Sequence, residues 1–232
     1  MFSILTQAGL LMVLRWFHFL AGITWIGLLY YLNFVQGSFF AETDATTKSN
    51  AIQKLLPRVL WWFRWAAMVT FLAGVAYLGL NADVLANSLS YRVPILIGAG
   101  LGTLMWANVW FIIWPAQKVV IASATQVAKG GQAIPEAAAR AARASVASRT
   151  NVLFSIPMLF FMGATQHLGV RVDADVNLWI LTAVLAVIIG ALEINAIKGK
   201  TGPMTSVKGV IHCGFALAVV LYIVMEVLTK KM

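Results

Sequence analysis

Five side chains in or beside the long apolar segments of the chain could bind a metal or move a proton. They are His18, His167, His212, Glu193 and Glu226, and they include all three histidines of the sequence. An ionisable group inside a bilayer is costly and marks a candidate functional site. The chemistry of the chain is therefore expected among these residues.

His18 and His167 have the surroundings expected of a bis-histidine haem site. Gly22 follows His18 by four residues and Gly163 precedes His167 by four, so each glycine lies one helical turn deeper than its histidine. A porphyrin needs such a bare surface beside its axial ligands, which predicts haem b with these two histidines as metal ligands. Arg15, one turn before His18, would hold a propionate or an anionic substrate. Plain packing of small residues between membrane helices is the alternative.

The sulfur-containing side chains make copper a weaker alternative to haem. Met158 and Met162 share a face with His167, and Cu(I) favours thioether ligands. The nine Met and one Cys of the sequence form no dense cluster, however. Cys213 by itself supplies neither a disulfide nor the Cys-x-x-Cys-His motif of covalently bound haem.

Glu193 and His212 are candidates for proton chemistry. They lie nearly equidistant from a turn near residues 202–203, so an antiparallel hairpin would place them at one depth. A contact between them could be a proton relay, a support for a ligand or an inert buried pair. We treat both as candidate catalytic residues.

The composition shows what kind of protein must position these groups. Hydrophobic residues make up 61% of the 232 and charged residues 11%, with a mean hydropathy of +0.85. A soluble domain carries about 25% charged residues. The composition predicts an all-α integral membrane protein, with a bundle of about six transmembrane helices in a single domain over residues 1–232. The six apolar segments run over residues 15–37, 60–80, 93–115, 152–168, 176–197 and 207–228.

Two further segments complete the expected architecture. Residues 1–14 are apolar, and we expect them to lie along the membrane surface with Arg15 at the interface, not to be a cleaved signal. Residues 116–150 are predicted to form a cytoplasmic helical hairpin between helices 3 and 4. Gly130 and Gly131 break its first helix, and the Ala-rich stretch from Pro135 forms its second.

The net charge of +9 is concentrated in particular loops. The segments after the first, third and fifth apolar stretches, with their flanks, carry twelve of the Lys and Arg residues, against five elsewhere. This bias predicts a multi-pass protein of the bacterial inner membrane with both termini periplasmic. The surplus therefore indicates contact with the lipid bilayer, and nucleic acid is not an expected partner.

The third segment carries further polar and aromatic signals. Trp106, Trp110 and Trp114 recur every four residues, which is typical of an aromatic belt, although a wall for a quinone or aromatic substrate is the alternative. Asn108 would be a buried polar group and must find a partner. Gly98 and Gly102 predict a close helix contact.

Three stretches of the sequence resemble one family. RWFHFLAGITWIG (15–27), NVWFIIWPAQKVV (108–120) and ASRTNVLFSIPMLFFMGATQH (147–167) resemble the membrane-bound urate hydroxylases, the urate oxidase N-terminal-domain family. The resemblance implies a membrane protein that oxidises urate to 5-hydroxyisourate and passes electrons to a cytochrome c. That cytochrome is usually a fused C-terminal domain, and because no Cys-x-x-Cys-His occurs here, we expect a separate cytochrome c.

Three function classes follow from these observations. The first is a membrane redox protein with haem on His18 and His167 and proton chemistry at Glu193 and His212. The second is a non-catalytic subunit that scaffolds or assembles a larger respiratory or oxygenase complex; in either case we expect a homo-oligomer or a complex subunit. A transporter is disfavoured because the apolar segments carry few charges.

Overall fold

The computed structural model describes residues 2–230 and contains six helical spans long and apolar enough to cross a membrane. Helix accounts for 87% of the structure, and the described residues include no strand. The predicted all-α fold with six candidate membrane spans is confirmed. The spans are Gln7–Glu42, Ala45–Leu80, Leu89–Ala128, Ala137–His167, Leu178–Lys198 and Val207–Leu228.

Short π-helical segments divide the first three spans into separately labelled helices. The first contains α1 (Gln7–Tyr30) and α2 (Gly37–Glu42), the second α3 (Ala45–Asn50) and α4 (Leu56–Leu80), and the third α6 (Leu89–Ala107) and α7 (Trp114–Ala128). The π-helical segments are Tyr31–Gln36, Ala51–Leu55 and Asn108–Ile113. Such segments often occur at functional sites.

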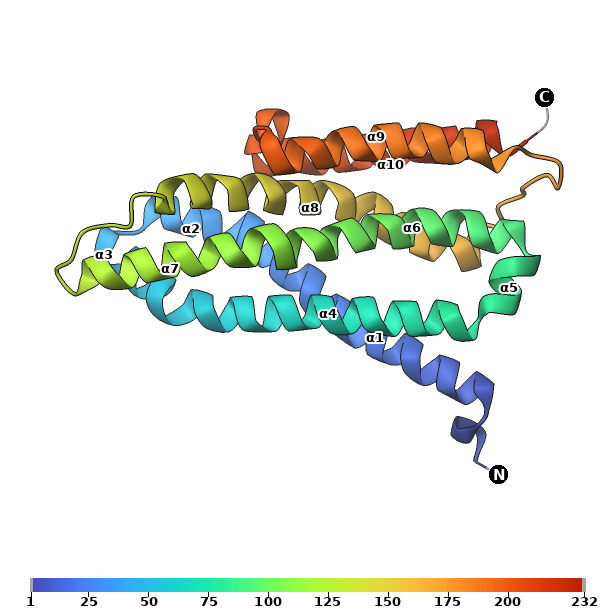
Figure 1. The fold of residues 1–232 in the computed structure, drawn as a ribbon, viewed down its shortest axis with the longest axis horizontal. Helices are drawn as coiled ribbons and strands as arrows, with labels where there is room; N and C mark the ends of the chain where they lie inside the picture. Colours follow the sequence, from blue (N-terminus) through green and yellow to red (C-terminus); the bar gives the residue numbers. More distant parts are fainter. Residues whose placement is uncertain (1, 231–232) are drawn as a thin grey trace.

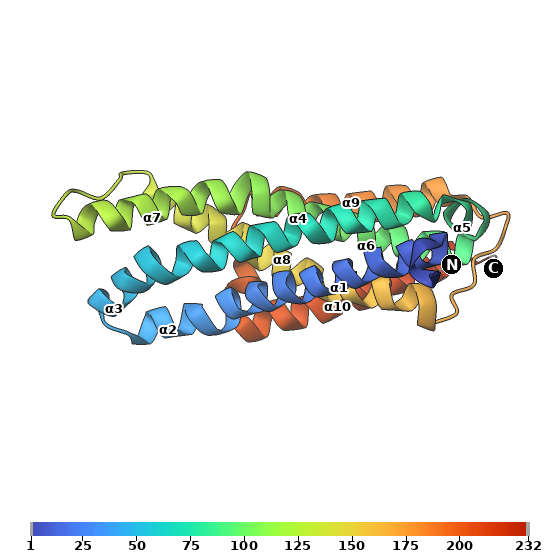
Figure 2. The same ribbon diagram turned by 90° about the horizontal axis from the view of Figure 1, so that it is seen from below.

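The remaining elements are α5 (Ala82–Asn87), α8 (Ala137–His167), α9 (Leu178–Lys198) and α10 (Val207–Leu228), with two short 3₁₀ turns at Ser3–Leu5 and Gly202–Thr205. Figures 1 and 2 show all six spans running along one long axis, with both chain ends at the same end of the bundle. The helical hairpin between spans three and four is confirmed. Its turn contains Gly130, whose φ of 84° a residue with a side chain rarely adopts.

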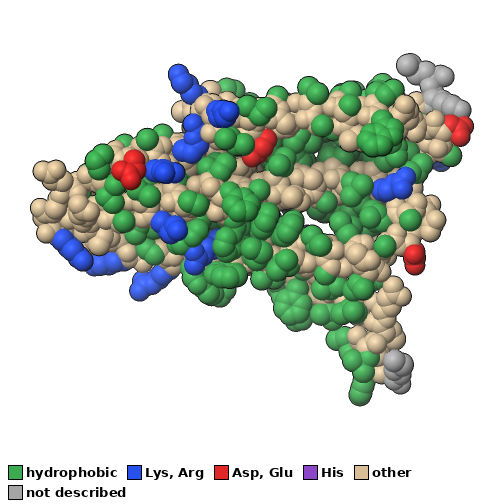
Figure 3. Space-filling view, viewed as in Figure 1, with side chains coloured by type: hydrophobic (Ala, Val, Ile, Leu, Met, Phe, Trp, Pro, Cys, Tyr) green, Lys and Arg blue, Asp and Glu red, His purple; other side chains and the backbone are tan. Residues whose placement is uncertain are grey.

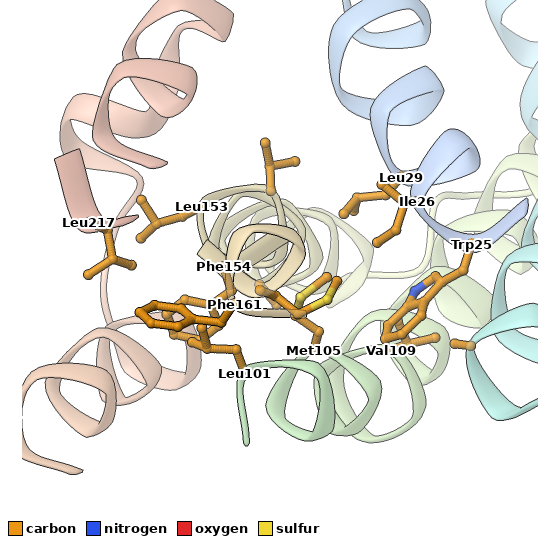
Figure 4. Close-up of a cluster of buried hydrophobic side chains, with 14 of the residues drawn as sticks. Trp25, Ile26, Leu29, Leu101, Met105, Val109, Leu153, Phe154, Phe161 and Leu217 are labelled. Atoms are coloured by element: carbon orange, nitrogen blue, oxygen red, sulfur yellow. The ribbon is translucent and has the colours of Figure 1, made fainter. Parts of the chain in front are cut away.

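The helix at the centre of the bundle is α8. It packs against α6, α7, α9, α10 and the first span, and its Phe154 and Phe161 are fully buried, as Figure 4 shows. A Cβ atom built on Gly98 of α6 would lie 3.3 Å from the Met162 backbone nitrogen, so the close contact predicted from Gly98 is confirmed. The Ala-rich stretch and the fourth apolar segment form one helix of 31 residues, because nothing between them ends it.

The spans differ in length, and this difference places the membrane. The first three contain 36, 36 and 40 residues and α8 contains 31, whereas α9 and α10 contain 21 and 22. At 1.5 Å per residue, α9 and α10 match the hydrocarbon core of about 30 Å, and the other four measure about 45 to 60 Å. The four longer spans therefore extend beyond the bilayer at the end that carries α2, α3 and the α7–α8 turn. Figure 3 shows Lys and Arg side chains gathered toward that end.

The turn between the first two spans lies in this extension and has a polar cap. The Asp44 carboxylate accepts hydrogen bonds from the Thr46 and Thr47 backbone N–H groups, each at 2.9 Å, and from the Thr47 hydroxyl. These bonds, that of the Thr47 hydroxyl foremost, lower the pKa of the Asp44 carboxyl. The cap fixes the start of α3.

The N-terminal segment differs from the expectation. Residues 7–14 do not form a separate surface segment but are the first turns of α1. The Thr6 hydroxyl caps the helix by accepting from the Gly9 N–H, and no proline interrupts it before Arg15. The Gln7 amide also donates to the Leu80 carbonyl at 3.1 Å, which fastens this end of α1 to α4.

Candidate functional site

A cluster of three polar side chains lies inside the bundle, where α6, α8 and α9 meet; we call it the polar node. Asn108 begins the π-helical segment after α6, Asn151 belongs to α8 and Glu193 to α9. The Asn108 amide donates to Asn151 Oδ1 at 3.0 Å and to Glu193 Oε2 at 3.1 Å. Asn108 and Asn151 are 1% and 0% exposed, and the partner required for Asn108 is therefore found.

The hydrogen bonds of the polar node leave it with a free acceptor. Asn151 also donates to the Met105 carbonyl at 2.9 Å. Both protons of the Asn108 amide are engaged, whereas Asn108 Oδ1 is buried and has no partner among the described residues. An unpaired buried acceptor costs free energy unless a ligand or water supplies a donor. The node can therefore accept a hydrogen bond from a hydroxyl group.

The predicted contact between Glu193 and His212 is not formed in the described structure. The hydrogen bond of the Glu193 carboxylate goes to Asn108, and His212 is exposed. The prediction used only the distances of Glu193 and His212 from the turn along the chain. It did not consider which face of its helix each side chain occupies. Val210 and Gly214 of α10 are buried, and a residue two positions away from each lies on the opposite side of the helix.

A second set of hydrogen bonds joins α8 to the C-terminal half of the first span. The Asn33 amide donates to the Ser148 hydroxyl at 2.8 Å, and the Tyr30 and Ser155 hydroxyls are 2.9 Å apart. Together with Asn151, these serines form a polar stripe on α8. Three successive turns of the central helix are thus each joined to a neighbour by a polar contact.

His18 lies on the N-terminal half of α1, where its neighbour is α4. Its Nδ1 is 2.9 Å from the Thr70 carbonyl oxygen, and a Cβ atom on Gly74 would come within 3.1 Å of its Cε1. Histidines that bind metals commonly donate the other ring N–H to such an acceptor. The contact leaves Nε2 available, so the ring is oriented as a ligand would be. A Cβ on Gly22 would lie 3.9 Å from Thr70 Cγ2, an ordinary van der Waals distance, and the place of Gly22 beside a haem stays a prediction.

His167 and Gly163 lie on the last turns of α8 and are exposed. A Cβ on Gly163 would meet no atom within 4 Å, so the surface beside His167 is open. Figure 1 shows that the outer half of α1 diverges from α8 toward the N-terminus. The contacts of His18 are accordingly with α4, and its pairing with His167 across a haem stays a prediction.

Arg15 is held by an aromatic residue that the sequence did not single out. Its guanidinium hydrogen-bonds to the Tyr77 hydroxyl and lies 5.0 Å from the centroid of the Tyr77 ring. Tyr77 stands on α4 one turn beyond Gly74, on the side that faces α1. The Arg15 guanidinium is thus held by α4, the helix that also contacts His18.

The three tryptophans of the third span form a ladder against α4. Trp106 stacks on Phe71 with ring centroids 4.3 Å apart, and Trp110 meets Trp65 edge to face at 5.5 Å. The Arg64 guanidinium lies 3.9 Å over the Trp114 ring. The stripe predicted as an aromatic belt is therefore also a helix–helix contact, while Trp61 and Trp62 on α4 remain exposed.

Replacing Asn151 by Leu is expected to lower the melting temperature of the detergent-solubilised protein. The change removes the amide from the polar node and leaves Asn108 and the Met105 carbonyl short of a partner, at a cost of about 1–3 kcal/mol. Asn87→Leu is the matched control because Asn87 is exposed on α5. Equal melting temperatures for the two variants, followed by circular dichroism, would contradict the structural role of the node.

The comparisons with known proteins give one match. Residues 80–226, more than half of the chain, match the sequence model of the family described as urate oxidase N-terminal. No curated protein and no solved structure matches the chain. The matched range contains the whole polar node and His167. Across the described residues, no group of three His, Cys, Asp or Glu side chains is placed to hold a metal ion.

Proposed function

The chain belongs to the urate oxidase N-terminal family, and from that premise we propose that it is an integral-membrane redox protein acting in the oxidation of urate to 5-hydroxyisourate. The family match carries this proposal, since it covers the spans that form the polar node. The six candidate membrane spans agree with the resemblance to membrane-bound urate hydroxylases.

Haem b is the proposed cofactor, and His18 is its best-supported ligand. Bound there, haem would supply one-electron redox chemistry. The Thr70 carbonyl holds Nδ1 and thereby fixes the direction of Nε2. His167 is the proposed second ligand, on the open surface beside Gly163. Arg15 offers its charge to a propionate or to an anionic substrate.

Glu193 is the proposed proton-accepting group. Asn108 orients its carboxylate, and the exposed side of the same residue can exchange protons with water near the end of α9. His212 is exposed and separate from Glu193, so its proposed part is exchange with the surroundings instead of direct transfer. Electrons are proposed to leave to a separate cytochrome c.

The basic end of the bundle is proposed to face the cytoplasm of a bacterial cell, with both termini in the periplasm. A cysteine at Gly131, in a Cys213→Ala background, should react with a membrane-impermeant maleimide in inverted vesicles. It should stay unlabelled in spheroplasts. Labelling in spheroplasts alone would reverse the orientation.

An absorption spectrum of the purified protein tests the redox proposal. We expect a Soret band and, after reduction, α bands, together with urate consumption when oxidised cytochrome c is added to membranes. Spectra without these bands would exclude haem. The same preparation eluting in a stable hetero-complex would then favour the scaffold function.

A further inference from the structure

A groove with apolar walls runs between α6 and α9 because of how these helices pack. Both pack against the central helix α8, whereas direct contact between α6 and α9 is sparse in the described structure. The groove has a volume of about 600 Å³, and its walls include Leu96 and Leu104 of α6 and Leu181 and Leu185 of α9. A space of this size lies in the range of ligand sites.

The length of the groove corresponds to one leaflet of a bilayer. Its lining runs from Arg92 to Leu104 on α6 and from Leu178 to Gly190 on α9, which is about 18 Å along each helix at 1.5 Å per residue. Half of the hydrocarbon core measures about 15 Å. Because α9 matches the thickness of that core, the groove extends from the membrane surface at the end of the bundle where the chain termini lie (Figure 1) to just beyond the midplane.

The walls of the groove suit a hydrocarbon chain. Besides Arg92, the polar residues that line it are Thr103 and Thr182, whose hydroxyls already donate to the Ala99 and Leu178 carbonyls of their own helices, each at 2.8 Å. The remaining lining side chains are aliphatic. A chain between the two walls contacts protein on both sides, and dispersion contacts of this kind add up over its length.

Arg92 brings a positive charge to the outer end of the groove. It stands in the first turn of α6, beside the start of α9 at Leu178. Across the described residues, the Arg92 guanidinium has neither a hydrogen-bond nor an ion-pair partner. A guanidinium binds phosphate oxygens through two parallel hydrogen bonds, and the phosphates of a bilayer lie at this level. The charge of Arg92 therefore complements a lipid phosphate.

We propose that the groove holds an acyl chain of a phospholipid from this leaflet, with the lipid phosphate bound to the Arg92 guanidinium. The lipid fills the space between α6 and α9 and takes the place of a direct helix contact. It thereby fastens the α9–α10 hairpin to the third span. Lipid binding of this kind needs neither haem nor urate, so the inference goes beyond the proposed redox function.

Native mass spectrometry of the delipidated protein tests the head group with two probes that carry equal chains, dioleoyl phosphatidylglycerol and dioleoylglycerol. We expect the phospholipid to bind about tenfold more tightly, the difference that a hydrogen bond to a charged group supplies. Arg92→Gln should remove this preference. Arg171→Gln, which changes an exposed arginine of the α8–α9 loop outside the groove, is the matched control and should keep it.

Gly190→Leu tests the place of the acyl chain. A Cβ at Gly190 meets no atom within 4 Å, so the leucine side chain enters the groove, and both probes should bind about tenfold more weakly. Gly79→Leu, equally free of clashes and outside the groove, is the control. Gly100→Leu blocks the opposite wall in the same way and replaces Gly190→Leu if circular dichroism shows that the latter does not fold.

Three results would overturn the proposal. The first is equal binding of the two probes to the unaltered protein, and the second is equal uptake of phospholipid by Gly190→Leu and Gly79→Leu. The third is a lipid-free dimer that Gly190→Leu dissociates, which would assign the groove to a second copy of the chain. Haem spectra and urate turnover play no part in these measurements, so their outcome is separate from that of the proposed function.

Discussion

The His18→Ala variant is expected to lose the Soret and α bands of the purified protein entirely. The change removes the ring whose Nδ1 is fixed by the Thr70 carbonyl and whose Nε2 is the proposed ligand of the haem iron. Loss of one axial ligand changes the spectrum of a low-spin haem, and His18 is the best-oriented ligand of the proposed haem, so its removal would take away the main attachment of that cofactor. Absorption of the variant, purified alongside the unaltered protein, measures the effect.

Two matched histidine variants make this result specific. His212→Ala should keep the bands, since His212 is exposed on α10 and far from Thr70 in the chain. His167→Ala should shift the bands if it is the second ligand. Undiminished bands in His18→Ala would contradict the assignment, and a circular dichroism spectrum shows whether each variant has kept its helices.

Replacing Phe154 by Ala is expected to lower the free energy of unfolding by about 3–5 kcal/mol, the range found for large aromatic residues in well-packed interiors. Phe154 lies at the centre of α8 and is fully buried, so its loss leaves a cavity that neither lipid nor water fills. The effect is large because α8 touches most of the other spans.

Phe215→Ala provides the comparison on the outer surface. Phe215 is 60% exposed on α10, so lipid tails replace the lost contacts and the expected change is small. Both variants can be unfolded from mixed micelles with increasing denaturing detergent. Similar midpoints for the two would show that α8 is not the packing centre.

The sequence predicted the spans well because length and apolar character are local properties. It also required a partner for Asn108, since a buried amide in hydrocarbon cannot remain unpaired. It did not identify Asn151, which stands one residue before the predicted start of the fourth apolar segment. The signal that could have found it is the absence of a helix-breaking residue between the Ala-rich stretch and the fourth apolar segment. That absence predicts one continuous helix with Asn151 in its interior.

The sequence did not show which helices pack against one another. The depth of Glu193 was estimated correctly enough to place it near the end of α9, but its partner depended on which helix α9 packs against. Likewise Thr70 of α4 lies beside Gly22, a neighbour that the sequence could not indicate. The π-helical segment at Asn108–Ile113, which begins at the node, has no comparable sequence signature.

The central position of α8 has a consequence for how the protein enters the membrane. The spans at the periphery, α9 and α10, are the most apolar of the six, and α8, the most enclosed, is the least apolar. A helix of this kind partitions poorly into lipid by itself, because the side-chain amide of Asn151 finds its hydrogen-bond partners on the third span. During synthesis α6 precedes α8 and supplies one such surface, while α10 follows it. Stable insertion of α8 is therefore a cooperative event, in which the earlier spans supply its polar partners and α10 later covers another of its faces.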